Sequence, residues 1–169
     1  TVAFALKDAA AHARTPHWSR YVSAVVAALQ DHGHQVGGCD LAITSTVPDG
    51  AGLSSSAALE VALGSSISHR VSLALGLDDI AKIGQYAENR FVDCQCGIMD
   101  QLASASASHK HALLLACKSL KTRPIPLPTS HDIFVIHSGI RRGLVDSEYN
   151  QRRVECEAAA RALGVSHLC

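Results

Sequence analysis

A glycine-rich turn at residues 48–58 constrains the fold and chemistry of this chain more than any other feature. It reads PDGAGLSSSAA and runs directly into an alanine-rich helical pattern. Glycine lets a backbone approach an anion closely, and the unpaired N–H groups at a helix start favour negative charge. The turn therefore predicts a phosphate-binding loop that opens a helix. The alternative is an ordinary helix start capped by a serine hydroxyl, since serine is a preferred N-cap residue.

The composition is typical of a small globular domain. The 169 residues are 47% hydrophobic, which is enough to bury one core. Fifteen basic and fifteen acidic residues balance, and no basic cluster alternates with aromatic residues, so we expect a small-molecule ligand and no nucleic acid. No apolar run reaches the roughly 18 to 20 residues of a membrane span. We therefore expect a soluble protein with no membrane partner.

The cysteine and histidine patterns argue against disulfides and metal centres. Six cysteines follow no signal peptide and show no CxxC spacing, so neither a disulfide framework nor a zinc site is expected. Among ten histidines, the pairs His32/His34 and His109/His111 lack an HExxH pattern and a third ligand. We interpret the histidines as loop or surface residues and expect a reduced, cytoplasmic protein.

Apolar residues recur at helical spacing in several segments. Thr15 and Pro16 are typical of an N-cap and the first residue of a helix that ends before Gly33. A second helix is predicted to begin at about Ser54. The helices expected from spacing, caps and terminal glycines span about 16–33, 54–76, 79–91 and 146–163.

Three segments are predicted to be strands. Residues 39–47 alternate apolar and polar side chains and lead into the glycine-rich turn. Short apolar runs at 112–117 and 132–137 indicate two further strands. The prolines between them, at 124, 126 and 128, keep that connection out of any central strand. Around the turn the predicted order is strand, anion loop and helix.

Four residues are candidates for catalysis or binding. The turn lacks the Gly-Lys-Ser/Thr ending of a Walker loop, so another group must neutralise the phosphates. Asp100 follows a break in the chain and is either a general base or an ordinary acidic residue at a helix start. Glu88 is either a Mg²⁺ ligand or part of a solvated helix face. Arg141 could face a phosphoryl group or lie on the surface, and Tyr149 could contact a ligand or pack.

Four motifs occur together in a fixed order, and together they resemble a known family. They are PxxxGLSSSAA, AENxF, CGIMDQ and SEYNQRRxECEAAA. In this order they are similar to galactokinase, a branch of the GHMP small-molecule kinases. The resemblance implies an α+β GHMP kinase fold, whose N-terminal domain is like domain 2 of ribosomal protein S5. It also implies that residues 1–138 are part of the ATP-binding domain and that 139–169 begin a C-terminal region.

The resemblance implies that ATP transfers its γ-phosphate to the C1 hydroxyl of D-galactose with the help of Mg²⁺. It assigns Asp100 the role of base toward that hydroxyl, with Arg141 beside it. Gly97 and Tyr149 would line the sugar pocket, and Ser56 and Glu88 would hold Mg²⁺. Trp18 would lie against adenine, and the phosphates would be wrapped by Gly50, Gly52, Leu53, Ser54, Ser55 and Ser56.

The chain also departs from the family pattern. The family usually has glycine and proline shortly before CGIMDQ, where this chain reads Val92-Asp93-Cys94-Gln95-Cys96. The N-terminal GRxNLIGEH-type motif and the third, C-terminal glycine-rich motif are not found in it. We therefore expect an internal fragment that is a poor or inactive catalyst alone, from a parent that is a monomer.

Three other functions remain open at this stage. One is a related sugar kinase acting on arabinose, fucose or N-acetylgalactosamine. Another is a non-catalytic sensor of galactose and ATP, and the last is a truncated remnant that keeps a nucleotide-binding surface. A substrate panel separates the first from galactokinase, and ATP binding without turnover would indicate the second.

Overall fold

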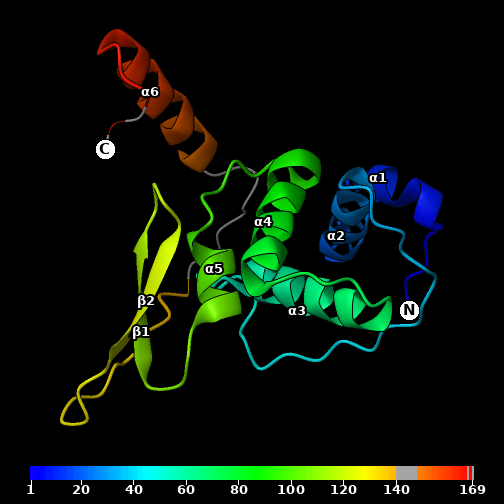
Figure 1. Cartoon of the computed structure of the whole chain (residues 1–169), viewed down its shortest axis with the longest axis horizontal. Helices are drawn as coiled ribbons and strands as arrows, with labels where there is room; N and C mark the ends of the chain where they lie inside the picture. The colour runs from blue at the N-terminus through cyan, green and yellow to red at the C-terminus, as the bar shows by residue number, and fades with distance from the viewer. Residues whose placement is uncertain (140–147, 167, 169) are drawn as a thin grey trace.

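The body of the molecule is a group of helices that pack around a shared apolar core. The structure is a computed structural model that describes residues 1–139, 148–166 and 168. Four helices form the body, after a short 3₁₀ turn η1 (Leu6–Asp8) and α1 (Ala9–His12): α2 (Arg20–Asp31), α3 (Ser55–Arg70), α4 (Leu77–Ala87) and α5 (Met99–Ser106). Figure 1 shows α4 and α5 packed against α3, with α2 on the other side of α4.

The predicted helices are confirmed, but their boundaries differ, and the helix predicted at 54–76 ends at Arg70. The helix expected from residue 16 begins at Arg20. The Thr15 hydroxyl donates to the carbonyl of His12 at 2.7 Å and so closes the preceding α1 instead of capping the next helix. The apolar face of α2 is buried in the core, where Val25 and Leu29 have no exposed surface.

Helix α4 ends in a widened turn that carries one of the candidate residues. After Ala87 the chain continues as a π-helix, η2 (Glu88–Val92), so the helix predicted at 79–91 is present with a different last turn. Wide turns of this kind occur often at functional sites. Glu88 is the first residue of η2, and Asp93 then leaves the helix with a left-handed φ of 60°.

A single hairpin forms the sheet of the described residues. Strand β1 (His111–Ala116) pairs antiparallel with β2 (Lys121–Pro126), so the strand predicted at 112–117 is confirmed. Within β2, Pro124 and Pro126 lie opposite Leu113 and His111. The N–H of Leu127 donates to the carbonyl of Lys110 at 2.9 Å, so by alternation both proline nitrogens face away from β1.

The strands predicted at 39–47 and 132–137 are wrong for this chain. Neither segment has strand structure, although both are described throughout. Alternating or continuous apolar residues suit a strand, but a strand forms only where a neighbouring chain supplies backbone hydrogen bonds. The second segment instead exposes four consecutive apolar side chains, Ile133, Phe134, Val135 and Ile136.

The last described helix, α6 (Glu148–Ala162), agrees with the helix predicted at 146–163, whose first two residues lie outside the described residues. Helices and a separate antiparallel hairpin together confirm the α+β class. The proposed division at residue 138 stays a prediction. In the described ranges no helix is long and apolar enough to span a bilayer.

Candidate active site

The glycine-rich turn enters α3 through an unusual backbone path. Gly50 and Gly52 have φ values of 66° and 73°, and Ser54 adopts the left-handed region with φ of 55°. This region costs a non-glycine residue roughly 1–2 kcal/mol. Strain of this kind is concentrated at functional sites, where the surrounding structure holds it in place. Ser54 is thus held in a conformation that an ordinary helix start does not need.

The start of α3 has no side-chain cap among the described residues. The alternative prediction of a helix capped by a serine hydroxyl is therefore wrong. The Ser55 hydroxyl is directed to Asp49 at 3.5 Å instead of to the helix backbone. The first helical bond runs from the Ala58 N–H to the Ser54 carbonyl at 3.0 Å. The preceding N–H groups have no helical acceptor, which is the arrangement that attracts an anion.

Asp100 lies in the first turn of α5, as predicted, and its side chain is exposed. Its neighbour Gln101 is completely buried and fixes this turn against two other helices. The Gln101 Nε2 donates to Glu60 Oε2 at 3.1 Å and to Glu88 Oε2 at 3.2 Å. The position of Asp100 is thereby set by a buried hydrogen-bond network, while its own carboxylate faces outward.

The Gln101 network joins two of the sequence motifs, AENxF and CGIMDQ, to helix α3. Glu60 comes from α3, Glu88 from the start of η2 and Gln101 from α5. Ser56 precedes Glu60 by four residues, so the two residues lie one turn apart on the same face of α3. Gly84 of α4 makes room for the network, because a Cβ there would lie 3.2 Å from Gln101 Cγ and 3.3 Å from Glu60 Cβ.

Burial decides between the two interpretations of Glu88. Its side chain is only 3% exposed, so the prediction of a solvated helix face is wrong. Glu60 is 1% exposed and lies beside it. Burial, and next the charge of Glu88, raise the pKa of Glu60 well above its usual range. Burial also raises the pKa of Tyr21 to about 12, with the charge of Glu88 as the second cause.

Two cysteines complete this cluster. The Cys96 Sγ donates to Glu88 Oε2 at 2.9 Å. A hydrogen bond between the two thiols lowers the pKa of Cys94 and raises that of Cys96. Cys94 is buried, and Cys96 is half-buried. The cluster can therefore be reached from solvent on the side of Cys96.

The cluster is able to accept a cation. In the described part of the chain, Glu60 Oε1, Glu88 Oε1 and Gln101 Oε1 are buried without a hydrogen-bond partner. A buried oxygen without a partner is costly, and a bound cation removes that cost. Glu88 therefore fits a Mg²⁺ ion, which prefers oxygen ligands, and the role of Ser56 as a Mg²⁺ ligand stays a prediction.

Comparison with known proteins agrees with this geometry. The sequence matches the family described as "GHMP kinases N terminal domain" over residues 20–108, which is more than half of the chain. The chain belongs to the GHMP kinases. Its structure is similar to that of the galactokinase from Lactococcus lactis solved in complex with galactose, with a TM-score of 0.76 and 28% sequence identity. The similarity covers 88% of this chain and 39% of the Lactococcus chain.

In this GHMP kinase domain the SEYN motif meets the loop that precedes α5. Asn150 of α6 accepts a hydrogen bond from the Gln95 N–H at 2.9 Å, and its Nδ2 donates to the Asp93 carbonyl at 2.9 Å. The backbone of Tyr149 lies beside this contact in α6, and its side chain is outside the described residues, as is all of Arg141. Their roles, and that of Gly97 just before α5, stay predictions.

Trp18 lines a pocket that contains no residue of the glycine-rich turn. It is 53% exposed and lines a pocket of about 610 Å³ together with residues 1–4 and 36–41. None of the residues lining this pocket comes from 48–58. A contact between Trp18 and adenine stays a prediction, although the geometry gives it no support.

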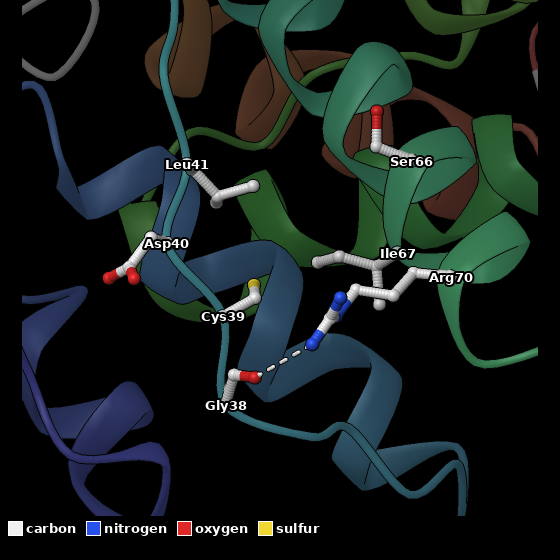
Figure 2. Close-up of a pocket in the computed structure, with 7 residues that line it drawn as sticks. All are labelled: Gly38, Cys39, Asp40, Leu41, Ser66, Ile67 and Arg70. Atoms are coloured by element: carbon white, nitrogen blue, oxygen red, sulfur yellow. Dashed lines mark hydrogen bonds between the residues drawn. The ribbon is translucent and has the colours of Figure 1, made fainter.

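A second pocket, of about 380 Å³, lies between residues 38–41 and the C-terminal half of α3. Figure 2 shows Arg70 reaching from α3 to the carbonyl of Gly38, a bond of 3.3 Å. Ser66 and Ile67 form the α3 side of the pocket. No residue that the sequence assigned to the GHMP kinase site lines it.

Sequence reasoning missed Glu60, Gln101 and Asn150. Glu60 gave the clearest signal, because it is the first charged residue of α3 and is surrounded by small and apolar residues. Gln101 and Asn150 are polar residues of ordinary appearance. Their importance depends on partners more than ten positions away in the chain, at Glu60 and at Gln95.

Proposed function

We propose that this domain belongs to a sugar kinase that transfers the γ-phosphate of ATP to the C1 hydroxyl of D-galactose. The observation that carries the proposal is the Gln101 hydrogen-bond network, which joins α3, η2 and α5 through Glu60 and Glu88. It links the helix that follows the glycine-rich turn to the helix that carries Asp100. The chain spans 39% of the similar galactokinase, so the proposal concerns the activity of which this domain is a part.

The proposed roles follow from the chemistry of phosphoryl transfer. Such reactions need mainly positioning and neutralisation of negative charge. The backbone N–H groups of residues 50–56 hold the phosphates of ATP. Mg²⁺, when bound, neutralises charge on those phosphates. Glu88 and Ser56 are the proposed side chains that hold it.

Asp100 is the proposed base. Its carboxylate accepts the proton of the sugar hydroxyl as that oxygen attacks the phosphorus. Because Gln101 is fixed in the buried network, the first turn of α5 keeps Asp100 in place without contact between Asp100 and the core. We propose that Gly97 and Tyr149 line the sugar pocket and that Arg141 lies near Asp100. Trp18 remains a candidate for contact with adenine.

The first experiment measures galactose-dependent ADP release and, separately, ATP binding, both with Mg²⁺. Asp100→Asn is expected to lower the rate by about 10²- to 10⁴-fold while ATP affinity stays within twofold. Asp78→Asn is the matched control, since Asp78 is an exposed acidic residue in the first turn of another helix, α4. Turnover that persists in Asp100→Asn would contradict the assignment of Asp100.

A panel of galactose, arabinose, fucose and N-acetylgalactosamine then identifies the sugar. Release of ADP with another sugar but not with galactose would support the proposed kinase activity and contradict galactose as its substrate. ATP binding without release for any sugar would favour a sensor or an incomplete kinase. Absence of ATP binding by the unsubstituted chain would contradict the proposed nucleotide site.

A further inference from the structure

The C-x-C segment before α5 has a feature that phosphoryl transfer does not use. Cys94 and Cys96 lie beside Glu88, and one ligand atom from each of these three residues falls within 4.8 Å of the others. Three exposed cysteines of the described residues lie outside this group: Cys39, Cys117 and Cys156. Two sulfurs and one oxygen form a donor set that differs in kind from the all-oxygen set that Mg²⁺ prefers.

We propose that Cys94, Cys96 and Glu88 form a binding site for a thiophilic divalent cation of the Zn²⁺ class. Zn²⁺ takes thiolate, imidazole and carboxylate ligands in tetrahedral sites, often with three protein ligands and one solvent molecule. Cys96 is half-buried, so the fourth position opens toward solvent on its side. This site shares Glu88 with the proposed Mg²⁺ site, so the two cations would compete for that carboxylate, and its test is a thiolate–metal band and not kinase turnover.

The distances are close to those that such an ion needs. Sulfur and oxygen ligands of one tetrahedral zinc lie roughly 3.5 to 3.8 Å apart, given the usual bond lengths. The Cys96 Sγ and Glu88 Oε2 are 2.9 Å apart, so their hydrogen bond places the thiol beside the carboxylate and lengthens when the metal replaces the proton. Bringing all three atoms within range needs a movement of about 1 Å, which side-chain rotation supplies. No change of the helices is required.

An independent observation also points to a ligand. The Glu88 side chain is almost fully buried, and its Oε1 has no hydrogen-bond partner among the described residues. A carboxylate that is buried for structural reasons alone is expected to have both oxygens satisfied. Coordination through Oε1 satisfies the oxygen that the protein leaves unpaired, while Oε2 keeps the hydrogen bond from Gln101 Nε2.

The surroundings hold the three ligands in place. The Gln101 Nε2 donates to Glu88 Oε2 at 3.2 Å, which is the kind of outer contact that orients a metal-binding carboxylate. The Gln85 side chain donates to the Cys96 carbonyl at 3.1 Å. The Cys96 N–H donates to the Cys94 carbonyl at 2.8 Å, which fixes the turn between the two thiols.

Binding of Zn²⁺ at this site replaces the protons of the two thiols. Each thiol loses its S–H bond, the sulfur electron pair forms the bond to Zn²⁺, and the two protons go to solvent. An ionised Glu88 contributes a lone pair from one carboxylate oxygen and releases no proton. The site thus takes up a double positive charge and releases two protons, so no oxidant is needed.

Cobalt is the probe that tests this site, because thiolate-bound Co²⁺ has a charge-transfer band in the near ultraviolet. The chain is reduced with a phosphine and carries serine in place of its other cysteines, Cys39, Cys117, Cys156 and Cys169. Titration is expected to give one equivalent of bound Co²⁺ with this band, and Zn²⁺ is expected to bleach it. Absence of the band in this reduced variant would overturn the proposal.

Substitutions then assign the ligands. Cys94→Ser is expected to abolish the band, and Glu88→Gln is expected to weaken Co²⁺ binding by more than about tenfold, the lower end of the loss caused by removing an outer contact. A band that persists in Cys94→Ser would overturn the site. If Cys94→Ser unfolds by circular dichroism, Cys96→Ser at the half-buried position takes its place.

Discussion

Asn150 holds the backbone of Gln95 in the way that a neighbouring strand would. Its Oδ1 accepts from the Gln95 N–H at 2.9 Å, and its Nδ2 donates to the carbonyl of Asp93 at 2.9 Å. One carboxamide thus satisfies a donor and an acceptor of the loop between η2 and α5. Because α6 is otherwise largely exposed, this contact couples the helix to the loop that leads to Asp100.

Asn150→Ala is expected to release α6 from that loop. Two hydrogen bonds of about 0.5–1.5 kcal/mol each are lost, so amide hydrogen exchange in α6 should accelerate by about 5- to 150-fold. Arg152→Ala is the control, because it removes only the exposed pair with Glu155 on the same helix. Equal protection of α6 in both variants would mean that the Asn150 contact does not hold the helix.

Glu60→Gln is expected to flatten the dependence of stability on pH. The pKa of Glu60 is raised by burial and by Glu88, so the folded state keeps a proton that the unfolded state loses. The contribution of Glu60 is fully present below the ordinary glutamate pKa and is lost as pH rises toward its folded value. Glu60→Gln should therefore have a larger free energy of unfolding than the unsubstituted chain at neutral pH and the same free energy of unfolding in acid.

Glu155→Gln is the matched control for this pH profile, which chemical unfolding at several pH values measures. Its pKa is lowered, first by the hydrogen bond from Gln151 and next by that from Arg152. The stabilisation from Glu155 is therefore present above the ordinary glutamate pKa and lost as pH falls. The two substitutions should change the profile in opposite directions, and a common direction would contradict the assignment for Glu60.

Gly52→Ala is expected to destabilise the chain by about 1 kcal/mol and to weaken ATP binding. No atom lies within 4 Å of a Cβ at Gly52, so the cost comes from its φ of 73° and not from a clash. Gly37 is equally open but has no positive φ. Gly37→Ala should instead stabilise by about 0.4–1 kcal/mol through the unfolded state. Denaturant titration compares them, and equal effects would contradict the backbone argument.

Replacing Phe134 and Ile136 by threonine is expected to reduce self-association without loss of stability. These side chains are 83% and 88% exposed and belong to a continuous apolar run. The unfolding free energy should change by no more than about 0.5 kcal/mol, because little packing is lost. Light scattering measures association. Leu102→Ala, at a fully buried position, should lower the free energy of unfolding by about 2–5 kcal/mol. It is the positive control for the stability measurement.

The positions of the helices follow from the local spacing of apolar residues. The arrangement of the candidate active site does not follow from that spacing. The apolar spacing of residues 20–31 and 77–91 is visible in the sequence because a helix buries one face whatever lies opposite. The burial of Glu88 could not be predicted in this way. It depends on Gln101, which is thirteen positions away, and on Glu60, which comes from another helix.

The strand predictions failed because a strand needs a partner that a local pattern does not reveal. Residues 132–137 have the composition of a strand, but composition does not supply the neighbour that a strand needs. The prolines of β2 argued against a strand, yet both occupy positions whose nitrogens face outward. A search for CxxC spacing does not detect that Cys94 and Cys96 lie beside Glu88, because Glu88 comes from η2 and not from the cysteine pattern.

The prolines of β2 also determine where the hairpin can accept another strand. A strand added along the outer edge of β2 would find no donor at Pro124 or Pro126 and would lose successive rungs of the ladder. The outer edge of β1 has no proline, and only its first residue, His111, already donates its N–H, to the Ser108 carbonyl at 3.2 Å. Any enlargement of this sheet, whether within a complete protein or in an unwanted aggregate, is therefore directed to the side of β1.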